Sequence, residues 1–211
     1  DSKINFDFFS SIEKIFERKD DKYIFKSNTN NYIYIYDEKI DSVFCINCNS
    51  IVLPANVIIN DLFLDENDLL WVGTTNGMFV FNNDFSTLKK FTSFKKLYNS
   101  NIRVIKKGNN GNIWVGSDNG LGLIKNSNSG EVLEFRKGID STTIISNQIM
   151  DLDWDNNRNE LWISTNGGIS LFNDKYKKFI NFQETPFSES IIENSVENIL
   201  IAEKSGKVWF T

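Results

Sequence analysis

Histidine is absent from the 211 residues of this chain. Its absence excludes a Ser-His-Asp or Cys-His nucleophile within these residues, a histidine metal ligand and a phosphoacceptor histidine. No other constellation with the residue types of a known active site is recognisable. We therefore expect no catalytic residue, no metal and no cofactor, and hence no enzyme activity in this segment.

Cysteine is scarce, since the chain has only Cys45 and Cys48. A zinc site on this Cys-x-x-Cys pair would need two further thiol or imidazole ligands, and the chain has none. A thioredoxin-like redox pair would need a βαβ context, whereas the flanking residues predict strands. Two alternatives remain, a local disulfide or two unpaired thiols.

The chain also lacks an apolar run of the length that crosses a bilayer. The longest candidate, Ile51 to Leu64, is interrupted by Pro54 and by polar residues. We expect no membrane contact by this segment. The chain begins at Asp1 and shows no signal peptide, so we expect a processed or excised segment.

Excess positive charge is lacking as well, because the formal net charge is −5. Lysines occur in pairs that are scattered along the chain. Phosphate binding needs clustered Lys and Arg. We therefore expect no nucleic acid partner.

What the chain does have is a sequence motif that occurs in three complete copies and in a fourth copy that stops at the last residue. The copies begin at Trp71, Trp114, Trp162 and Trp209, with spacings of 43, 48 and 47 residues. A period in the forties, built from short strands, is typical of β-propeller blades. The repeat predicts an all-β fold, a β-propeller with four-stranded antiparallel blades. It predicts about four and a half blades, an incomplete arc of a seven-bladed propeller.

We expect residues 1–211 to form a single propeller segment. The alternation of apolar and polar residues, together with the residues typical of turns, divides this segment into blades. The predicted blades cover residues 12–46, 58–92, 102–135 and 149–182, with a partial blade over 196–211. In the degenerate first blade Tyr23 takes the place of the tryptophan. The turn Asn76-Gly77 predicts a type I′ hairpin. A lone strand over Ile4 to Phe8 would either close a ring onto the last half-blade or leave the array open, and we favour the open arc.

The repeated motif has two structural positions. The tryptophans are expected to fill the wedge between adjacent blades, where each buries a large apolar area: Trp71, Trp114, Trp162 and Trp209. Gly73 and Gly116 follow two residues later, and a missing Cβ there lets the neighbouring blade or the indole ring approach closely. The fourth blade has Ser164 at this place, so the requirement is for a small residue.

Polar residues recur on the first strand of successive blades, ten or eleven residues before each tryptophan: Asp61, Arg103, Asp151 and Asn198. If these strands line the central channel, the four side chains ring it. Together with the aromatic face of Trp154 they would supply the convergent hydrogen-bonding groups that a sugar ligand needs. The alternative is a structural polar ring bound to water.

Alternation places Asp151, Asp153 and Asp155 on one face of a strand. The segment looks like the start of a calcium loop, but Asn156 and Trp162 stand where an EF-hand loop needs Gly and Glu. The carboxylates either hold a cation, or face solvent and bind the backbone of the neighbouring blade. The second alternative is favoured, and no metal site is predicted.

Two stretches, Asp65 to Phe81 and Asn110 to Ile124, resemble the two-component regulator propeller repeat. Both contain a polar turn, Leu/Ile-Trp-Val-Gly, then Asn-Gly and an apolar strand. Asp155 to Phe172 is similar, with Ser164 in place of the glycine. The resemblance implies the periplasmic sensor region of a hybrid histidine kinase of the Bacteroidetes type, an inner-membrane receptor that senses glycan-derived oligosaccharides.

The resemblance further implies partners for the segment. They are an oligosaccharide ligand, further propeller blades and domains of a longer parent chain, and a second copy in a homodimer. Two other functions fit the same repeat. One is a scaffold for protein–protein assembly in a secretion or surface complex, and the other is a glycan-active propeller enzyme.

Overall fold

Five antiparallel sheets follow one another along the chain in the computed structural model of the protein. The structure describes residues 12–27, 31–47, 53–126, 130–140, 142–185, 191, 193–202 and 204–211. All regular elements in these ranges are strands. None of the described residues forms a helix with the length and apolarity needed to cross a membrane.

Four of the sheets have four strands each, and we call them blades one to four. Blade one contains β1 (Ile12–Glu17), β2 (Lys22–Ser27), β3 (Ile33–Asp37) and β4 (Ser42–Cys45). Blade two contains β5 (Ile59–Leu64), β6 (Leu70–Thr74), β7 (Gly77–Phe81) and β8 (Leu88–Lys90). Blade three contains β9 (Ile102–Lys107), β10 (Ile113–Ser117), β11 (Gly120–Lys125) and β12 (Glu131–Phe135). Blade four contains β13 (Ile149–Asp155), β14 (Glu160–Thr165), β15 (Gly168–Asn173) and β16 (Lys178–Phe182).

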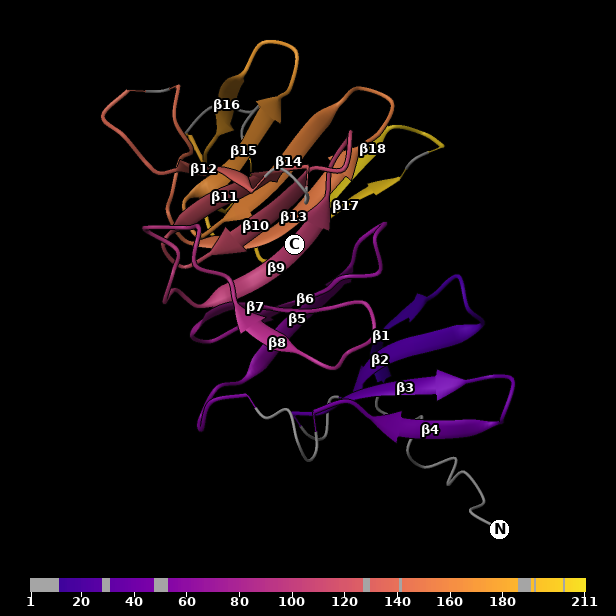
Figure 1. Ribbon diagram of the computed structural model, residues 1–211. Helices are drawn as coiled ribbons and strands as arrows, with labels where there is room; N and C mark the ends of the chain where they lie inside the picture. Colours follow the sequence, from indigo (N-terminus) through magenta and orange to yellow (C-terminus); the bar gives the residue numbers. More distant parts are fainter. Residues whose placement is uncertain are drawn as a thin grey trace.

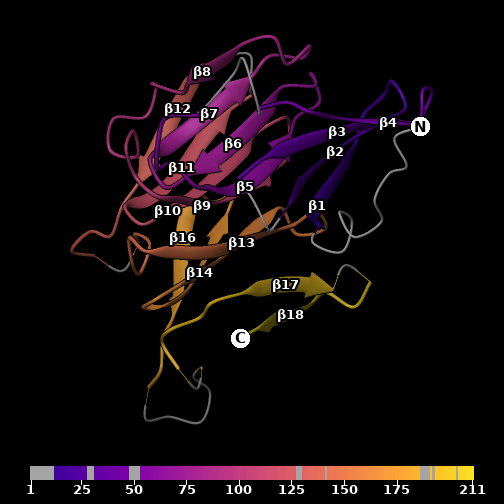
Figure 2. The ribbon, with the colours of Figure 1, turned by 90° about the horizontal axis from the view of Figure 1, so that it is seen from below.

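The fifth sheet is a half-blade of two strands, β17 (Ile199–Ala202) and β18 (Lys207–Phe210). In every sheet the strands pair in the order in which they occur in the chain. Figures 1 and 2 show the sheets fanned into an arc, with the first strands β1, β5, β9, β13 and β17 toward its middle. This is the blade arrangement of a β-propeller, and the predicted fold class is confirmed.

The arc is not closed by pairing among the described strands, since no strand of blade one pairs with β17 or β18. The strand predicted over Ile4 to Phe8 lies outside the described residues. So does Cys48. Cys45 is disulfide-bonded, so the alternative of unpaired thiols is wrong for this residue.

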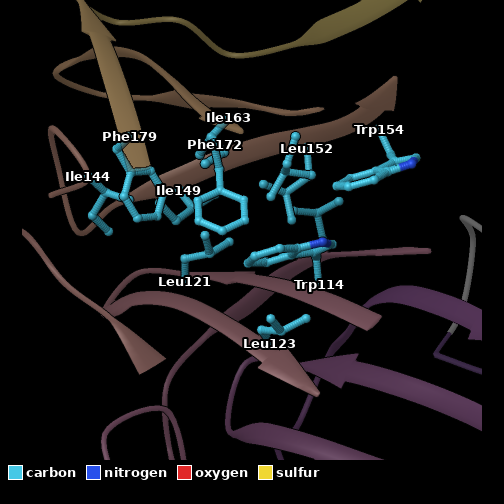
Figure 3. Packing of buried hydrophobic residues seen from close by; sticks show 12 residues of the cluster. Trp114, Leu121, Leu123, Ile144, Ile149, Leu152, Trp154, Ile163, Phe172 and Phe179 are labelled. Atoms are coloured by element: carbon cyan, nitrogen blue, oxygen red, sulfur yellow. The ribbon is translucent and has the colours of Figure 1, made fainter. Parts of the chain in front are cut away.

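Apolar side chains fill the spaces between neighbouring blades. Trp71 packs with Ile102 and Ile105 of blade three. Trp114 is only 1% exposed and packs against blade four, where its ring centroid lies 5.2 Å from that of Phe172 (Figure 3). Successive side chains on a strand point to opposite faces, so each tryptophan projects toward the blade that follows it.

Trp209 departs from the pattern expected of a wedge residue, because it is 61% exposed. In the complete blades a phenylalanine of the fourth strand lies near the tryptophan ring, as Phe135 does for Trp114 and Phe182 for Trp162. Among the described residues no third or fourth strand follows β18, and no further blade packs on it. The indole of Trp209 therefore has no wedge to fill.

The glycines of the repeat accommodate the next blade. A Cβ on Gly73 would lie 2.8 Å from Cγ2 of Ile102, and one on Gly116 would lie 2.7 Å from Cγ2 of Ile149. Both distances are too short for carbon atoms in contact. In blade four Ser164 fits at this place, and its hydroxyl donates to the carbonyl of Asp151 at 3.3 Å.

The hairpin after the tryptophan strand differs from the predicted type I′ turn. Thr74 pairs with Gly77, so Thr75 and Asn76 are the central residues, and neither has a positive φ. A type I′ turn needs positive φ at both. Gly77 itself has φ of 90°, and the Thr74 hydroxyl accepts from the Asn76 N–H at 3.1 Å and donates to the Gly77 carbonyl at 2.7 Å.

The same side-chain bridge recurs in blades three and four. Ser117 and Thr165 donate to the carbonyls of Gly120 and Gly168, respectively. The hydroxyl residue that ends each tryptophan strand thus fixes the hairpin. We infer that this is why Thr or Ser occupies the position in all three copies.

Candidate functional site

A polar cavity of about 250 Å³ lies where the first strands of the blades meet. It is lined by Lys14, Asn60, Asp61, Arg103, Val104, Met150, Asp151 and Asn198. We call it the channel cavity. The structure therefore brings together the four recurring residues that the sequence places on the first strands. They come from four different sheets.

Bulges in the inner strands create this lining. Pairing between β5 and β6 skips Asn60, pairing between β9 and β10 skips Arg103, and pairing between β13 and β14 skips Met150. A β-bulge re-aims the side chains around it. Each bulge thus brings two consecutive residues to the cavity.

The strand pairing shows that Arg103 is not equivalent in position to Asp61 and Asp151, contrary to what the sequence repeat suggested. Asp61 pairs with Gly73 and Asp151 with Ser164, while the residue that pairs with Gly116 is Val104. Arg103 therefore occupies the bulge position. An arginine at a bulge can reach the channel cavity without the burial that Asp61 undergoes.

Asp61 is 6% exposed and bonds to two neighbouring blades. Its Oδ2 accepts the backbone N–H of Ile105 in blade three at 2.7 Å. Its Oδ1 accepts the N–H of Leu62 at 2.8 Å and forms an ion pair with Lys14 of blade one. Burial raises the pKa of Asp61 above its usual value, and the opposing effects of Lys14 and the two N–H groups do not cancel that rise.

Asp151 and Asp153 make the equivalent connection from blade four to the half-blade. Asp151 accepts the N–H of Ile199 at 3.1 Å, and Asp153 accepts the N–H of Ile201 at 2.7 Å. Lys106 lies 2.6 Å from Asp153 Oδ1. Burial raises the pKa of Asp151, although the N–H of Ile199 acts against it. These are the bonds to a neighbouring blade that the sequence offered as an alternative to a cation site.

Asp155 has a different role, in the turn after β13. It accepts the N–H groups of Asn157 at 2.8 Å and Arg158 at 3.0 Å, and its Oδ2 lies 2.6 Å from Arg158 Nε. Although burial acts to raise the pKa of Asp155, these bonds and the Arg158 charge lower it overall. Within the described ranges no group of three or more acidic, Cys or His side chains is placed to hold a metal ion.

Trp154 does not join the four channel residues. It lies three residues after Asp151 on β13, farther along the strand and on the opposite face, and it packs in the cluster of Trp114 (Figure 3). With Asp153 it lines a separate cavity of about 340 Å³, beside Lys106 and Lys107. Trp154 is 6% exposed, so it presents little aromatic face to a ligand.

Two channel residues keep accessible hydrogen-bonding groups. Arg103 bonds through Nε to Asp118, and the described residues supply no hydrogen bond to its other guanidinium nitrogens. Asn198 is exposed and donates to the Thr211 hydroxyl at 3.1 Å. Asp61 and Asp151 hold the blades together, whereas Arg103 and Asn198 keep polar groups exposed toward the channel cavity.

A second, larger site was missed by the sequence interpretation. A groove of about 650 Å³ lies between blades three and four, on the side away from the first strands. It is lined by Asn110, Asn112, Leu123, Lys125, Asn126, Glu131, Leu133, Phe135, Phe172, Asp174 and Lys177. One feature of the sequence could have indicated this groove. Leu133 is apolar, whereas the residue at the equivalent position of the fourth strand in blade two is Lys89.

Residues 52–76 match the sequence model of the family described as "Two component regulator propeller". The chain carries a two component regulator propeller repeat. The matched residues contain β5, β6 and the cavity-lining pair Asn60 and Asp61. No curated protein sequence matches the chain.

Solved structures share the fold of this chain. The extracellular domain of a hybrid two component system from B. thetaiotaomicron superposes with a TM-score of 0.71 at 17% identity, over 95% of this chain and 26% of that one. The extracellular domain of a second such system of the same organism superposes with a TM-score of 0.68 at 17% identity, over 95% of this chain and 25% of that one. PorZ, a surface component of the type-IX secretion system of Porphyromonas gingivalis, superposes with a TM-score of 0.70 at 16% identity, over 94% of this chain and 30% of PorZ. The chain spans about a quarter of the two hybrid-system domains.

Proposed function

We propose that this chain, residues 1–211, is a ligand-binding propeller segment of a two-component signalling receptor, a hybrid histidine kinase, and that it senses a glycan-derived oligosaccharide in the periplasm. The observation that carries the proposal is the regulator propeller repeat, whose matched residues include two that line the channel cavity. The fold shared with the extracellular domains of two hybrid systems supports it.

The channel cavity is suited to hydrogen bonding with hydroxyl groups. Arg103 supplies guanidinium donors from blade three, and Asn198 supplies an amide from the half-blade. A saccharide bound to both would connect two sheets that are otherwise linked through blade four. Because a ligand shifts a protein toward the conformation that it binds best, such bridging would favour one angle between the blades. Further domains of the parent chain, or a second copy, would receive that change.

A thermal-shift screen of the chain against neutral and acidic oligosaccharides tests this proposal. A ligand that binds only the folded state raises the unfolding midpoint. We expect at least one saccharide to raise it, and the rise to be smaller in Asn198→Ala. Asn83→Ala, which removes an exposed amide that does not line the channel cavity, is the matched control. An unchanged midpoint across the whole panel would count against a saccharide sensor.

A scaffold for protein–protein assembly is the second candidate function. Its support is the similarity in fold to PorZ, described as an essential surface component of a secretion system. The full-length coding sequence discriminates between the two. A kinase module downstream of the propeller supports the receptor, and its absence supports the scaffold.

A propeller enzyme has less support. The fold is also shared with a streptogramin B lyase, at a TM-score of 0.63 and 17% identity. A virginiamycin B lyase from Staphylococcus aureus is catalytically inactive when one histidine is replaced, and this chain contains no histidine. Glycan turnover that disappears in Asp151→Asn or Asp153→Asn would restore this candidate.

A further inference from the structure

The groove between blades three and four has an apolar floor with a fixed shape. Phe172 and Leu123 are 2% and 5% exposed, and Leu133, at the groove edge, is 38% exposed. The Phe135 ring lies 5.9 Å from Phe172 and 5.4 Å from Phe179, centroid to centroid. Because its neighbours are buried, Phe135 is held in one orientation and presents a preformed apolar surface.

The charged groups at the groove edge neutralise one another. Lys125 Nζ lies 2.6 Å from Glu131 Oε1 on the blade three side. Lys177 forms an ion pair with Asp174 on the blade four side. Asp174 also accepts from Asn109 at 3.3 Å, which ties the two blades together at one end of the groove. Each charged side chain among the described residues that line the groove therefore has a partner of opposite charge.

Amide side chains complete the edge of the groove. Asn110 and Asn112, from the turn between β9 and β10, line it together with Asn126. The volume of about 650 Å³ lies within the range of small-molecule sites, roughly 300–1,000 Å³. The amide of Asn112 already donates to Asn109 at 3.4 Å and accepts the N–H of Asn126 at 3.2 Å, so Asn110 is the amide placed to bond to a ligand. An amide beside an apolar floor matches a ligand with hydroxyl groups at its periphery and an apolar face.

We propose that this groove binds a neutral saccharide, whose ring stacks its C–H face on Phe135 and Leu133 while one of its hydroxyls bonds to the amide of Asn110. The site is separate from the channel cavity, since none of the described residues lines both. It therefore goes beyond the receptor function and holds whether or not the chain signals. A peptide along β12 is the competing occupant.

Equivalent positions in the other blades provide the test variants. Leu133 pairs with Leu123, as Lys89 pairs with Val80 in blade two and Ile180 pairs with Leu171 in blade four. Lysine is thus already accommodated at this place on an outer strand of the same fold. Ile180 is 52% exposed and does not line the groove, so Ile180→Lys is a matched control for Leu133→Lys.

The experiment is saturation-transfer NMR of the 211-residue chain with maltotriose, cellotriose and chitotriose, and with trigalacturonic acid as the charged comparison. We expect at least one neutral trisaccharide to bind, with little dependence on salt. Leu133→Lys should weaken its binding about tenfold or more, because the lysine replaces an apolar contact at the groove edge with a charge. Ile180→Lys should leave the affinity unchanged.

Three results would overturn the groove proposal. They are no binding by any neutral trisaccharide, stronger and salt-dependent binding of the acidic one, and equal binding by the wild type and Leu133→Lys. Near-UV circular dichroism of each variant verifies folding, and Leu133→Ala provides a second, uncharged variant with a smaller expected loss. The channel variant Asn198→Ala should not affect binding here, so failure of the groove site and failure of the receptor proposal are distinguishable.

Discussion

The carboxylate of Asp61 in blade two accepts the backbone N–H of Ile105 in blade three at 2.7 Å. This bond joins two sheets that share no strand. Asp151 and Asp153 repeat it between blade four and the half-blade. The ring of polar residues predicted from the sequence therefore divides into residues that hold blades together and residues that remain accessible.

Removing the Asp61 carboxylate should destabilise the fold. Asp61→Ala leaves the buried N–H of Ile105 and the Lys14 ammonium without their partner, and a buried unsatisfied donor costs about 1–3 kcal/mol. The matched control is Asp118→Ala, which breaks an exposed ion pair with Arg103 and should cost about 1 kcal/mol or less. Urea denaturation followed by circular dichroism measures both. An equal loss of unfolding free energy in Asp61→Ala and Asp118→Ala would contradict the interblade role of Asp61.

The tryptophans should differ strongly in their contribution to stability. Trp114 is 1% exposed and Trp209 is 61% exposed. We expect Trp114→Ala to lower the free energy of unfolding by about 3–5 kcal/mol, since it opens a cavity between blades three and four. Trp209→Ala should cost about 1 kcal/mol or less. A larger loss for Trp209→Ala in the 211-residue chain would show that its indole is packed in solution.

Alanine should destabilise the protein to different extents at two equivalent places in the repeat. In Gly116→Ala the new Cβ would meet Val104 and Ile149 side chains at 2.7 Å, and overpacking costs about 1–3 kcal/mol. In Ser164→Ala the Cβ is already present, and only hydroxyl bonds of 3.3 and 3.4 Å are lost. We expect Ser164→Ala to lower the free energy of unfolding by less than about 1 kcal/mol. Thermal unfolding of the two variants compares them directly.

The stability contributed by Asp155 should depend on pH. Its pKa in the folded state lies below the ordinary 3.8, so the folded state favours the ionised carboxylate. The contribution is therefore present above about pH 3.8 and is lost as the pH falls through the lower folded pKa. The difference in unfolding free energy between wild type and Asp155→Asn should shrink in that window. A difference that stays constant as the pH falls well below 3.8 would contradict the turn interactions.

Much of the fold could be predicted from the spacing of Trp71, Trp114 and Trp162, because one blade needs one repeat to bury its face. The strands followed from alternation. The bulges at Asn60 and Arg103 could not be predicted, since they depend on how the inner strand meets the next blade. The turn type was mispredicted because the hydroxyl of Thr74, one residue before the turn, controls its geometry.

The channel residues were predictable because they recur at one place in the repeat. The groove was not, because it is formed by residues of two blades that meet only after folding, such as Leu133 and Phe172. Trp154 was misplaced for a different reason. Alternation already puts it on the face of β13 opposite Asp151, and the prediction did not apply that rule to the sugar site. That face packs against blade three.

Isothermal titration calorimetry at the channel cavity tests the central claim most directly. The titrant is the oligosaccharide that most raises the unfolding midpoint, and the proteins are the wild-type chain, Arg103→Ala and the exposed control Arg136→Ala. The receptor proposal predicts binding by wild type and Arg136→Ala, and an affinity about tenfold or more lower in Arg103→Ala. Equal affinity in all three proteins, or no heat of binding in any, would contradict it.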